Sequence, residues 1–402
     1  MNEITINSRH DRIQIADALR GFALLSIVLL HNVEHYDFYF FPEGLPHWQK
    51  VLDSKLWDSV FFLFSGKSYA IFALLFGFSF FIQFNNQEKR GVDFRGRFVW
   101  RLFLLSVLGM FNSMFYSGDI LAFYGIIGLS LIPVCKWGDR AVLITVIIFM
   151  LQPWEWAELL YTLYHPGYQP PGNISSFYFG QADQYLQGSS FWELAKGNVW
   201  NGRLADITWS WENGRLFQTS AIFMLGMLLG RRGLFVSVES KLRFWRRALL
   251  LSAILFILLY LLKASLPAMI IKESLSGNVS LIISSCSNFA LASVLVSSFV
   301  LLYQINPIQR VLCHLAPFGR MSLTNYLVQS IVGSFIYYGY GLGLYKYTGA
   351  SFSILIGSTV IVIQIIFSHW WLKNYGQGPM ERLWHKLTWI NLSPSRVFQK
   401  AV

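Results

Sequence analysis

The chain has 402 residues, of which 54% are hydrophobic and only 13% are charged, and its mean hydropathy is +0.45. A soluble domain carries about 25% charged residues, so this composition excludes an ordinary soluble protein and indicates a helical membrane protein. The formal charge of +11 is spread over short basic clusters between apolar segments, which favours orientation in a membrane over binding to nucleic acid.

Apolar segments that we interpret as membrane spans follow one another along the whole chain. A helix needs roughly 17–25 mostly apolar residues to cross a bilayer. The expected spans lie near residues 15–34, 58–84, 98–115, 119–134, 141–162, 216–230, 247–264, 280–303, 322–344 and 351–372. We therefore expect an all-α fold, a polytopic transmembrane bundle of about ten spans in residues 1–372.

The first expected span carries an unusual number of polar residues on one face. On a helix that turns 100° per residue, Arg20 and His31 lie only about 20° apart in rotation and roughly 16 Å apart along the axis. Asp17, Glu34 and His35 flank the same face within about 60°. Arg20 would lie near the cytoplasmic boundary and His31 in the outer half of the span.

These polar residues have structural explanations as well as functional ones. Arg20 could extend to the lipid headgroups with Asp17 as its partner three residues earlier, and Glu34 and His35 could lie in the outer interface. His31 lies deeper, and an ionisable residue inside a span indicates a functional site by default. The structural alternative is that His31 is a neutral histidine hydrogen-bonded to another helix.

A metal site at the end of this span is not expected. His31 and His35 have the spacing of a helical metal pair, but the sequence HNVEH lacks the order of the H-E-x-x-H motif and no third ligand is evident. Three scattered cysteines do not provide a disulfide framework or a cysteine-rich zinc site.

Further polar groups lie inside later spans. Lys67 stands in SGKSYAIFALLFG and Asp119 in SGDILAFYGIIGL, where an ion pair between the two is plausible. Ser322, Asn325 and Gln329 form one stripe at helical spacing. The structural alternatives are a turn cap for Asp119 and hydrogen bonds between helices for the stripe.

Two segments outside the spans are long or distinctive. Residues 163–215 are polar and rich in tryptophan, which is typical of an interfacial aromatic belt or of a folded cap over a cavity. Residues 373–402 form the tail, which we expect to be cytoplasmic and amphipathic, although it could instead plug a cavity. Most of the 32 lysines and arginines fall on the side of the two termini, which predicts cytoplasmic ends.

Five segments in order resemble the YeiB-like membrane protein family (domain of unknown function 418), from about residue 12 to residue 390. They are ADALRGFALLSIVLLHN, GKSYAIFALLFG, GDILAFYGIIGLSLIP, GRMSLTNYLVQS and GPMERLWHKLT. That family is grouped with a wider set of transmembrane acyltransferases, including heparan-glucosaminide N-acetyltransferases and bacterial acyltransferase-three proteins. The bacterial enzymes carry an arginine, ten residues and a catalytic histidine in the first span, a spacing that Arg20 and His31 reproduce. YeiB-like proteins commonly have asparagine at the position of His31.

The resemblance implies a membrane-bound acyltransferase in the cell membrane, the inner membrane in a bacterium. Acyl-CoA would approach from the Arg20 side, drawn by the basic loops 85–101 and 231–247, and His31 would act as general base toward a hydroxyl or amine of an extracytoplasmic or lipid-linked acceptor. The expected partners are membrane lipids and these two substrates, with no metal and no nucleic acid. The expected substrate-binding residues are Arg20, Asn32, Glu34, His35, Lys67, Asp119 and Asn325.

Two other functions fit the same residues. In a transporter or flippase, Arg20, His31, Lys67 and Asp119 would bind an anionic substrate or relay protons. A lipid-binding scaffold without catalysis is the third possibility. Fold resemblance alone does not decide among the three.

Overall fold

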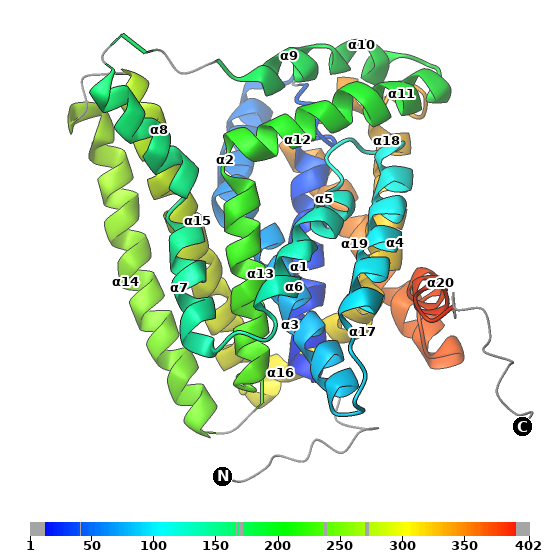
Figure 1. Ribbon diagram of the computed structural model, residues 1–402. Coiled ribbons are helices and arrows are strands. Elements are labelled where there is room, and N and C mark those ends of the chain that lie inside the picture. The colour runs from blue at the N-terminus through cyan, green and yellow to red at the C-terminus, as the bar shows by residue number, and fades with distance from the viewer. Residues whose placement is uncertain are drawn as a thin grey trace, which may run out of the picture.

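A computed structural model describes residues 13–40, 42–165, 167–168, 172–236, 239–269 and 273–390. Within these ranges every regular element is a helix, which confirms the all-α prediction. Most long helices run roughly side by side and form a bundle, and a layer of short helices crosses one end of it (Figure 1).

The longer helices make up the bundle. They are α1 (Gln14–Val33), α2 (His47–Phe64), α3 (Ser68–Glu88), α4 (Arg95–Ser113), α7 (Asp139–Met150), α8 (Pro153–Tyr164), α13 (Arg215–Arg231), α14 (Glu239–Met269), α15 (Glu273–Leu302), α18 (Ser322–Tyr337) and α19 (Ala350–Tyr375). Shorter helices are α5 (Ile120–Ile127), α6 (Leu131–Val134), α9 (Ile174–Gly180), α10 (Ala182–Gln187), α11 (Phe191–Gly197), α12 (Arg203–Glu212), α16 (Asn306–Leu312), α17 (Leu315–Arg320) and α20 (Pro379–Thr388).

Five helices in the described ranges are long and apolar enough to cross a membrane. They are Gln14–Val33, His47–Glu88, Glu239–Leu266, Ser276–Leu302 and Ala350–Tyr375. Helices α7 and α8, bent by 49° at their junction, would together make a sixth. The expected spans at 98–115, 119–134, 216–230 and 322–344 correspond to α4, α5–α6, α13 and α18, which do not reach the same length or hydrophobicity.

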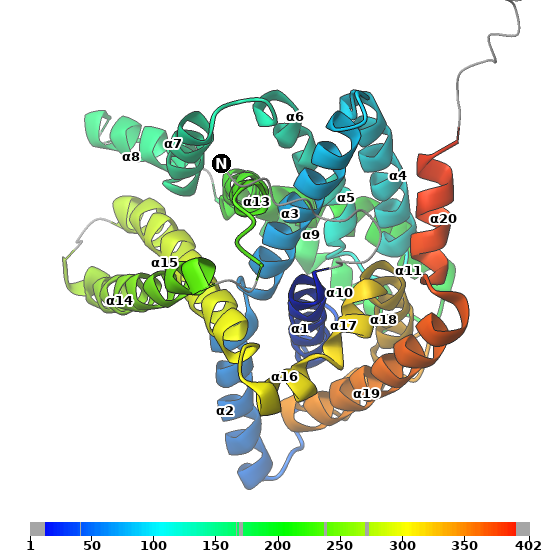
Figure 2. The same ribbon diagram turned by 90° about the horizontal axis from the view of Figure 1, so that it is seen from below.

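Helix α1 lies at the centre of the bundle, with α3, α17, α18 and α19 around it (Figure 2). Most of its apolar residues are buried, with Leu19 and Leu24 completely enclosed. Helix α17 approaches α1 so closely that a β-carbon on Gly21 would collide with the carbonyl of Leu315. The polar face of α1 therefore meets other protein segments rather than lipid.

Helix α13 is also an interior helix and packs along α3. A β-carbon on Gly77 of α3 would collide with the carbonyl of Phe223, and one on Gly226 of α13 with the carbonyl of Leu74. Nearly the whole of α13 is buried. A helix enclosed by protein does not need a continuous apolar surface, which explains why α13 is short and carries polar residues.

The second expected span, 58–84, is not one continuous helix. Helical structure begins earlier, at His47, and is interrupted at residues 65–67 between α2 and α3. Gly66 takes the left-handed conformation there, with φ of +77°, which a side chain would strain. Lys67 therefore lies at a break in the helix and not, as expected, inside a regular span.

The segment predicted as a belt or a cap folds into helices α9 to α12, which lie across one end of the bundle (Figure 1). Trp192 and Trp200 are mostly exposed on this layer, whereas Trp209 lines a cavity beneath it. We call residues 173–213 the cap. One segment thus presents aromatic side chains outward and also covers a cavity.

At the other end, α20 is docked onto the bundle. The Glu381 carboxylate accepts hydrogen bonds from the backbone amides of Leu323 (2.8 Å) and Thr324 (3.0 Å), which begin α18. The indole of Trp384 lies 3.6 Å from the Arg101 guanidinium of α4. The expected tail thus contains a packed helix after α19, while its residues beyond 390 lie outside the described ranges.

Candidate active site

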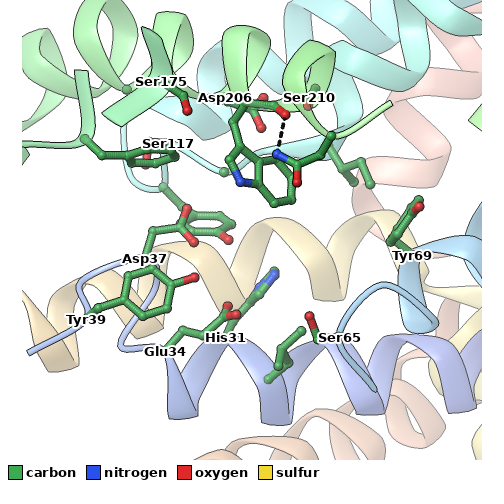
Figure 3. A pocket seen from close by; sticks show the side chains of 18 of the residues that line it. His31, Glu34, Asp37, Tyr39, Ser65, Tyr69, Ser117, Ser175, Asp206 and Ser210 are labelled. Carbon is green, nitrogen blue, oxygen red and sulfur yellow. Dashed lines mark hydrogen bonds between the residues drawn. The ribbon is translucent and has the colours of Figure 1, made fainter. Parts of the chain in front are cut away.

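A cavity of about 800 Å³ lies between the end of α1 and the cap. We call it the cap cavity (Figure 3). Its walls come from the end of α1, the break between α2 and α3, the turn between α4 and α5, the cap and α18. The residues that line it include His31, Glu34, Asp37, Ser68, Tyr116, Asp206 and Arg215.

His31 projects from the last turn of α1 into this cavity (Figure 3). Its ring packs against Tyr116, with centroids 4.8 Å apart, and against Tyr36 at 5.6 Å. The Nδ1 atom is buried and makes no hydrogen bond within the described residues. A buried polar atom without a partner is uncommon in proteins and is found at catalytic and ligand sites.

The chain leaves α1 through three consecutive left-handed residues. His35, Tyr36 and Asp37 have φ values of +50°, +57° and +65°. This conformation costs roughly 1–2 kcal/mol for each residue that has a side chain. The Tyr36 amide donates to the His31 carbonyl at 2.8 Å, and the Tyr338 hydroxyl donates to the Tyr36 carbonyl. This strained turn brings Asp37 back to the cavity beside His31, as is typical of functional sites.

Two carboxylates from opposite walls meet in the cap cavity. Burial raises the pKa of Asp37 to about 6, against the opposing effect of hydrogen bonds from the Tyr116 hydroxyl and the Gly118 amide. Burial also raises the pKa of Asp206 to about 7, although the Arg203 guanidinium 3.0 Å away favours its ionised form. Both carboxyls can thus exchange protons near neutral pH.

Arg215 is the only lysine or arginine among the described residues that line the cap cavity. Its guanidinium lies 4.1 Å from the ring centroid of Tyr69 and 4.9 Å from that of Trp209. Both rings line the same cavity. The aromatic faces on this wall are therefore already arranged around a cation.

A second cavity of about 290 Å³ lies toward the other end of α1, beside α20. We call it the arginine cavity because Arg20, Arg101 and Arg320 line it. Arg20 donates to Asp17 at 2.9 Å and to Ser79 at 2.8 Å, so its predicted partner is present. These guanidinium groups form a site suited to a phosphate or other anion.

Tyr326 of α18 lines both cavities and forms part of the wall between them. It is 2% exposed, and its hydroxyl accepts a hydrogen bond of 3.2 Å from the Ile120 amide at the start of α5. The hydroxyl of Tyr124, which lines the arginine cavity, donates to the carbonyl of Tyr69 at 2.7 Å. The two cavities are therefore neighbours separated by tyrosine side chains.

The structure places the expected α1 residues in different surroundings. His31 and Glu34 line the cap cavity, and Arg20 lines the arginine cavity. Asn32 instead donates to the Val28 carbonyl at 2.8 Å and accepts from the Tyr337 hydroxyl at 3.1 Å. It lies in the interior between helices and does not line either cavity.

His35 faces away from the cap cavity as well. Its Nε2 lies 2.9 Å from the Ser353 hydroxyl and 3.2 Å from that of Thr348, and its ring stacks on Tyr337. His31 and His35 thus point to different neighbours, and their helical spacing does not produce a shared site.

Asp119 and Asn325 are committed to contacts between elements. Asp119 caps α5 by accepting from the Ala122 amide at 3.1 Å, and it lies 3.6 Å from the Arg203 guanidinium of the cap. Arg203 therefore takes the place considered for Lys67. The Asn325 amide donates to the Ser368 hydroxyl at 2.9 Å, which joins α18 to α19. Asp119 thus caps a helix and Asn325 forms a hydrogen bond between helices, as the structural alternatives for these two residues predict.

Lys67 is buried at the break between α2 and α3, next to two cavity-lining residues, Gly66 and Ser68. Sequence reasoning did not single out Ser68, nor did it identify Asp37 and Asp206. The aromatic segment that carries Asp37 and the tryptophan-rich segment that carries Asp206 were the available signals, but neither predicts that the two carboxylates meet.

Comparison with known proteins finds similarity to one family and to full-length relatives. Residues 229–391 match the model of a family described as a protein of unknown function (DUF418). The uncharacterized protein YxaH of Bacillus subtilis (strain 168) is 26% identical, and the alignment covers 98% of each chain. The uncharacterized protein YeiB of Escherichia coli (strain K12) is also 26% identical, over 92% of this chain and 95% of the relative. The chain is therefore similar to the DUF418 family in residues 229–391 and to YxaH and YeiB over nearly its whole length.

The family model and the full-length relatives cover different parts of the site. The matched residues run from the end of α13 to just beyond α20, so they include Tyr326 but not α1 or the cap. An uncharacterized 39.9 kDa protein of Bacillus acidopullulyticus is 24% identical over 96% of both chains. Alignments of this length extend across the cap cavity as well.

Proposed function

We propose that the protein is a multi-pass membrane acyltransferase that moves an acyl group from acyl-CoA to a hydroxyl or amine of an extracytoplasmic or lipid-linked acceptor. This proposal rests on His31, which lines a cavity of about 800 Å³ and whose buried Nδ1 has no hydrogen-bond partner among the described residues. A cavity of this size suits a small molecule. The separate arginine cavity at the other end of α1 suits the phosphates of the donor.

We propose that ten helical segments, including α4, α5–α6, α13 and α18, lie within the cell membrane (the inner membrane in a bacterium) with both termini in the cytoplasm. The excess of lysine and arginine on the side of the termini supports this orientation. Interior helices such as α13 can be short and partly polar because other helices, not lipid, surround them. The cap and its cavity would then face outward, and membrane lipids would surround the bundle.

In this mechanism His31 acts as general base. It removes the proton from the acceptor hydroxyl or amine as that oxygen or nitrogen attacks the thioester carbonyl. The carbon–sulfur bond then breaks, the acyl group stays on the acceptor, and the CoA thiolate takes the proton from the imidazolium. An asparagine side-chain amide can stabilise the oxyanion that forms on the thioester carbonyl. Asn32 and Asn325 do not take this role here, because their side-chain amides already donate to the Val28 carbonyl and to the Ser368 hydroxyl.

Substitution of His31 tests the assignment. His31→Asn keeps a polar side chain of moderate size but removes the base. The rate at which the acceptor releases the CoA thiol from acyl-CoA should therefore fall about 10²–10⁴-fold. His165→Asn, an exposed histidine at the end of α8, serves as the matched control and should retain wild-type turnover. Equal rates of thiol release in the wild type and His31→Asn, with both folded, would remove His31 from the chemistry.

A transporter or flippase is the second candidate, because one observation favours it. Two cavities at opposite ends of α1 share Tyr326 as a wall, an arrangement that alternating access also uses. Substrate uptake into protein-containing vesicles, without any acyl-CoA turnover, would favour this function over acyl transfer.

A further inference from the structure

The cap cavity is acidic although the protein is basic. Four carboxylates line it, those of Glu34, Asp37, Asp183 and Asp206, against the single guanidinium of Arg215. The whole chain has a formal charge of +11. Arg203, which does not line the cavity, pairs with Asp206 at 3.0 Å. Carboxylates still outnumber the cations at this site, opposite to the balance of the whole molecule, and such a local field attracts cations.

The inner carboxylates are held close enough to repel one another. Asp37, from the turn after α1, interacts electrostatically with Glu34 on its own side and with Asp206 of the cap. Figure 3 shows Glu34 and Asp37 on the α1 side of the cavity and Asp206 on the cap side. Like charges that approach across an empty space are stabilised when a cation binds between them.

An unpartnered hydroxyl provides an independent sign of a polar ligand. Ser68 is 2% exposed, lines the cavity, and its Oγ makes no hydrogen bond within the described residues. Burying a hydroxyl without a partner is unfavourable, so a ligand that bonds to it gains free energy. Other serines line the same cavity: Ser65, Ser117, Ser175, Ser176 and Ser210.

Aromatic side chains complete the lining. Tyr69 and Trp209 border the cavity beside Arg215, and Tyr39 and Phe179 lie on other parts of its wall. Flat rings of this kind pack against the carbon skeleton of a polyol or sugar. Carboxylates, hydroxyls and rings therefore occur together in one cavity.

We propose that the cap cavity binds a cationic amine on a hydroxyl-rich skeleton, that is, an aminated sugar or polyol. The ammonium group lies among Glu34, Asp37 and Asp206, and the hydroxyls bond to serines that include Ser68. As a statement about the acceptor this rests on the proposed acyl transfer, but the binding itself does not require that reaction.

Two soluble probes test the ligand class. N-methylglucamine carries a cationic amine on a six-carbon polyol, and sorbitol has the same skeleton without the amine. Titration calorimetry on the full-length protein in detergent, without acyl-CoA, should show at least about tenfold tighter binding of N-methylglucamine than of sorbitol. Equal affinities, or tighter binding of sorbitol, would overturn the proposal and indicate a site for neutral polyols.

Carboxylate variants locate the binding site. Asp206→Asn should weaken N-methylglucamine binding about tenfold. Asp183→Asn, on an exposed position of the cap and thus without risk to folding, should weaken it about two- to threefold because solvent screens that charge. Asp93→Asn is the matched control, since Asp93 pairs with Arg95 in the loop before α4. A loss of affinity in the control, or none in Asp206→Asn and Asp183→Asn, would place the amine elsewhere.

The binding experiment is separable from the proposed chemistry. If N-methylglucamine binds with the expected variant pattern while thiol release is unaffected by His31→Asn, acyl transfer fails and the ligand class stands. If thiol release depends on His31 while the two probes bind equally, the ligand class fails and the proposed chemistry stands.

Discussion

The acidic residues of the cap cavity predict how the stability of the fold depends on pH. Asp37 and Asp206 have pKa values raised to about 6 and about 7, chiefly by burial. In the folded protein they therefore keep protons at pH values where the unfolded chain has already lost them. Their contribution to stability is present below about pH 4 and is lost as the pH rises toward 6 and 7.

Cation affinity should change in the opposite direction. N-methylglucamine binds the ionised carboxylates, so its affinity should rise between pH 5 and pH 8, with proton release that calorimetry in two buffers can measure. The charged and titratable groups around the two carboxyls include Glu34, Tyr39, Tyr116, Asp119, Asp183, Arg203, Arg215 and His31. Affinity that is constant over this range, or that falls, would contradict the placement of the amine among these carboxylates.

Helical rotation accounts for the positions of the polar residues of α1. Arg20, His31 and Glu34 share a face of α1, and each lines a cavity. Asn32 is rotated 100° from His31 and meets Tyr337 instead. His35 falls on the predicted face only if the helix continues, but the chain turns left-handed there and carries its ring to Ser353.

At the scale of elements, the break between α2 and α3 is a feature that hydropathy does not reveal. The residues around it are apolar enough for one long span, yet Ser65 and Gly66 line the cap cavity. Irregular backbone at membrane depth is tolerated where it borders a cavity, because its polar groups then avoid lipid. The interruption therefore coincides with the candidate site.

The contact between α3 and α13 predicts a stability difference between two glycine substitutions. Gly77→Ala should destabilise the protein by about 1–3 kcal/mol, because its β-carbon would collide with the Phe223 carbonyl. Gly96→Ala in α4 meets nothing within 4 Å and should leave stability unchanged or raise it slightly. Thermal unfolding in detergent measures both, and equal melting temperatures would contradict the close packing of α3 on α13.

The wall formed by α18 predicts a separate effect on turnover. Tyr326→Ala should join the two cavities and admit water to the donor, so that hydrolysis of acyl-CoA rises relative to transfer to an acceptor. Tyr326→Phe keeps the ring and should retain the wild-type ratio. Product analysis by mass spectrometry measures this ratio, and an unchanged ratio in Tyr326→Ala would show that the wall does not separate donor from acceptor.

At the scale of the molecule, composition predicts a helical membrane protein, and every expected span has a helical counterpart. What the sequence does not reveal is which helices are enclosed. Helix α13 is short and partly polar for a membrane span, which its sequence can tolerate because α3 and its neighbours cover it. The cap cavity joins segments from residue 27 to residue 326, and such long-range proximity has no signature in a single sequence.

The orientation of the bundle can be tested by labelling single cysteines in a variant that lacks Cys135, Cys286 and Cys313. A cysteine at Lys196 in the cap should react with a membrane-impermeant maleimide on intact cells. A cysteine at Arg90, in the loop before α4, should react only after permeabilisation. The reverse pattern would mean that the cap faces the cytoplasm.

The central claim is that one acyl donor reaches from the arginine cavity to His31. An experimental density map of the protein with a non-hydrolysable acyl-CoA analogue tests it directly. We expect phosphate density beside Arg20 and Arg101, with the thioester position next to Tyr326 and directed toward the imidazole of His31. A donor bound outside the arginine cavity, with its reactive carbon remote from His31, would contradict it.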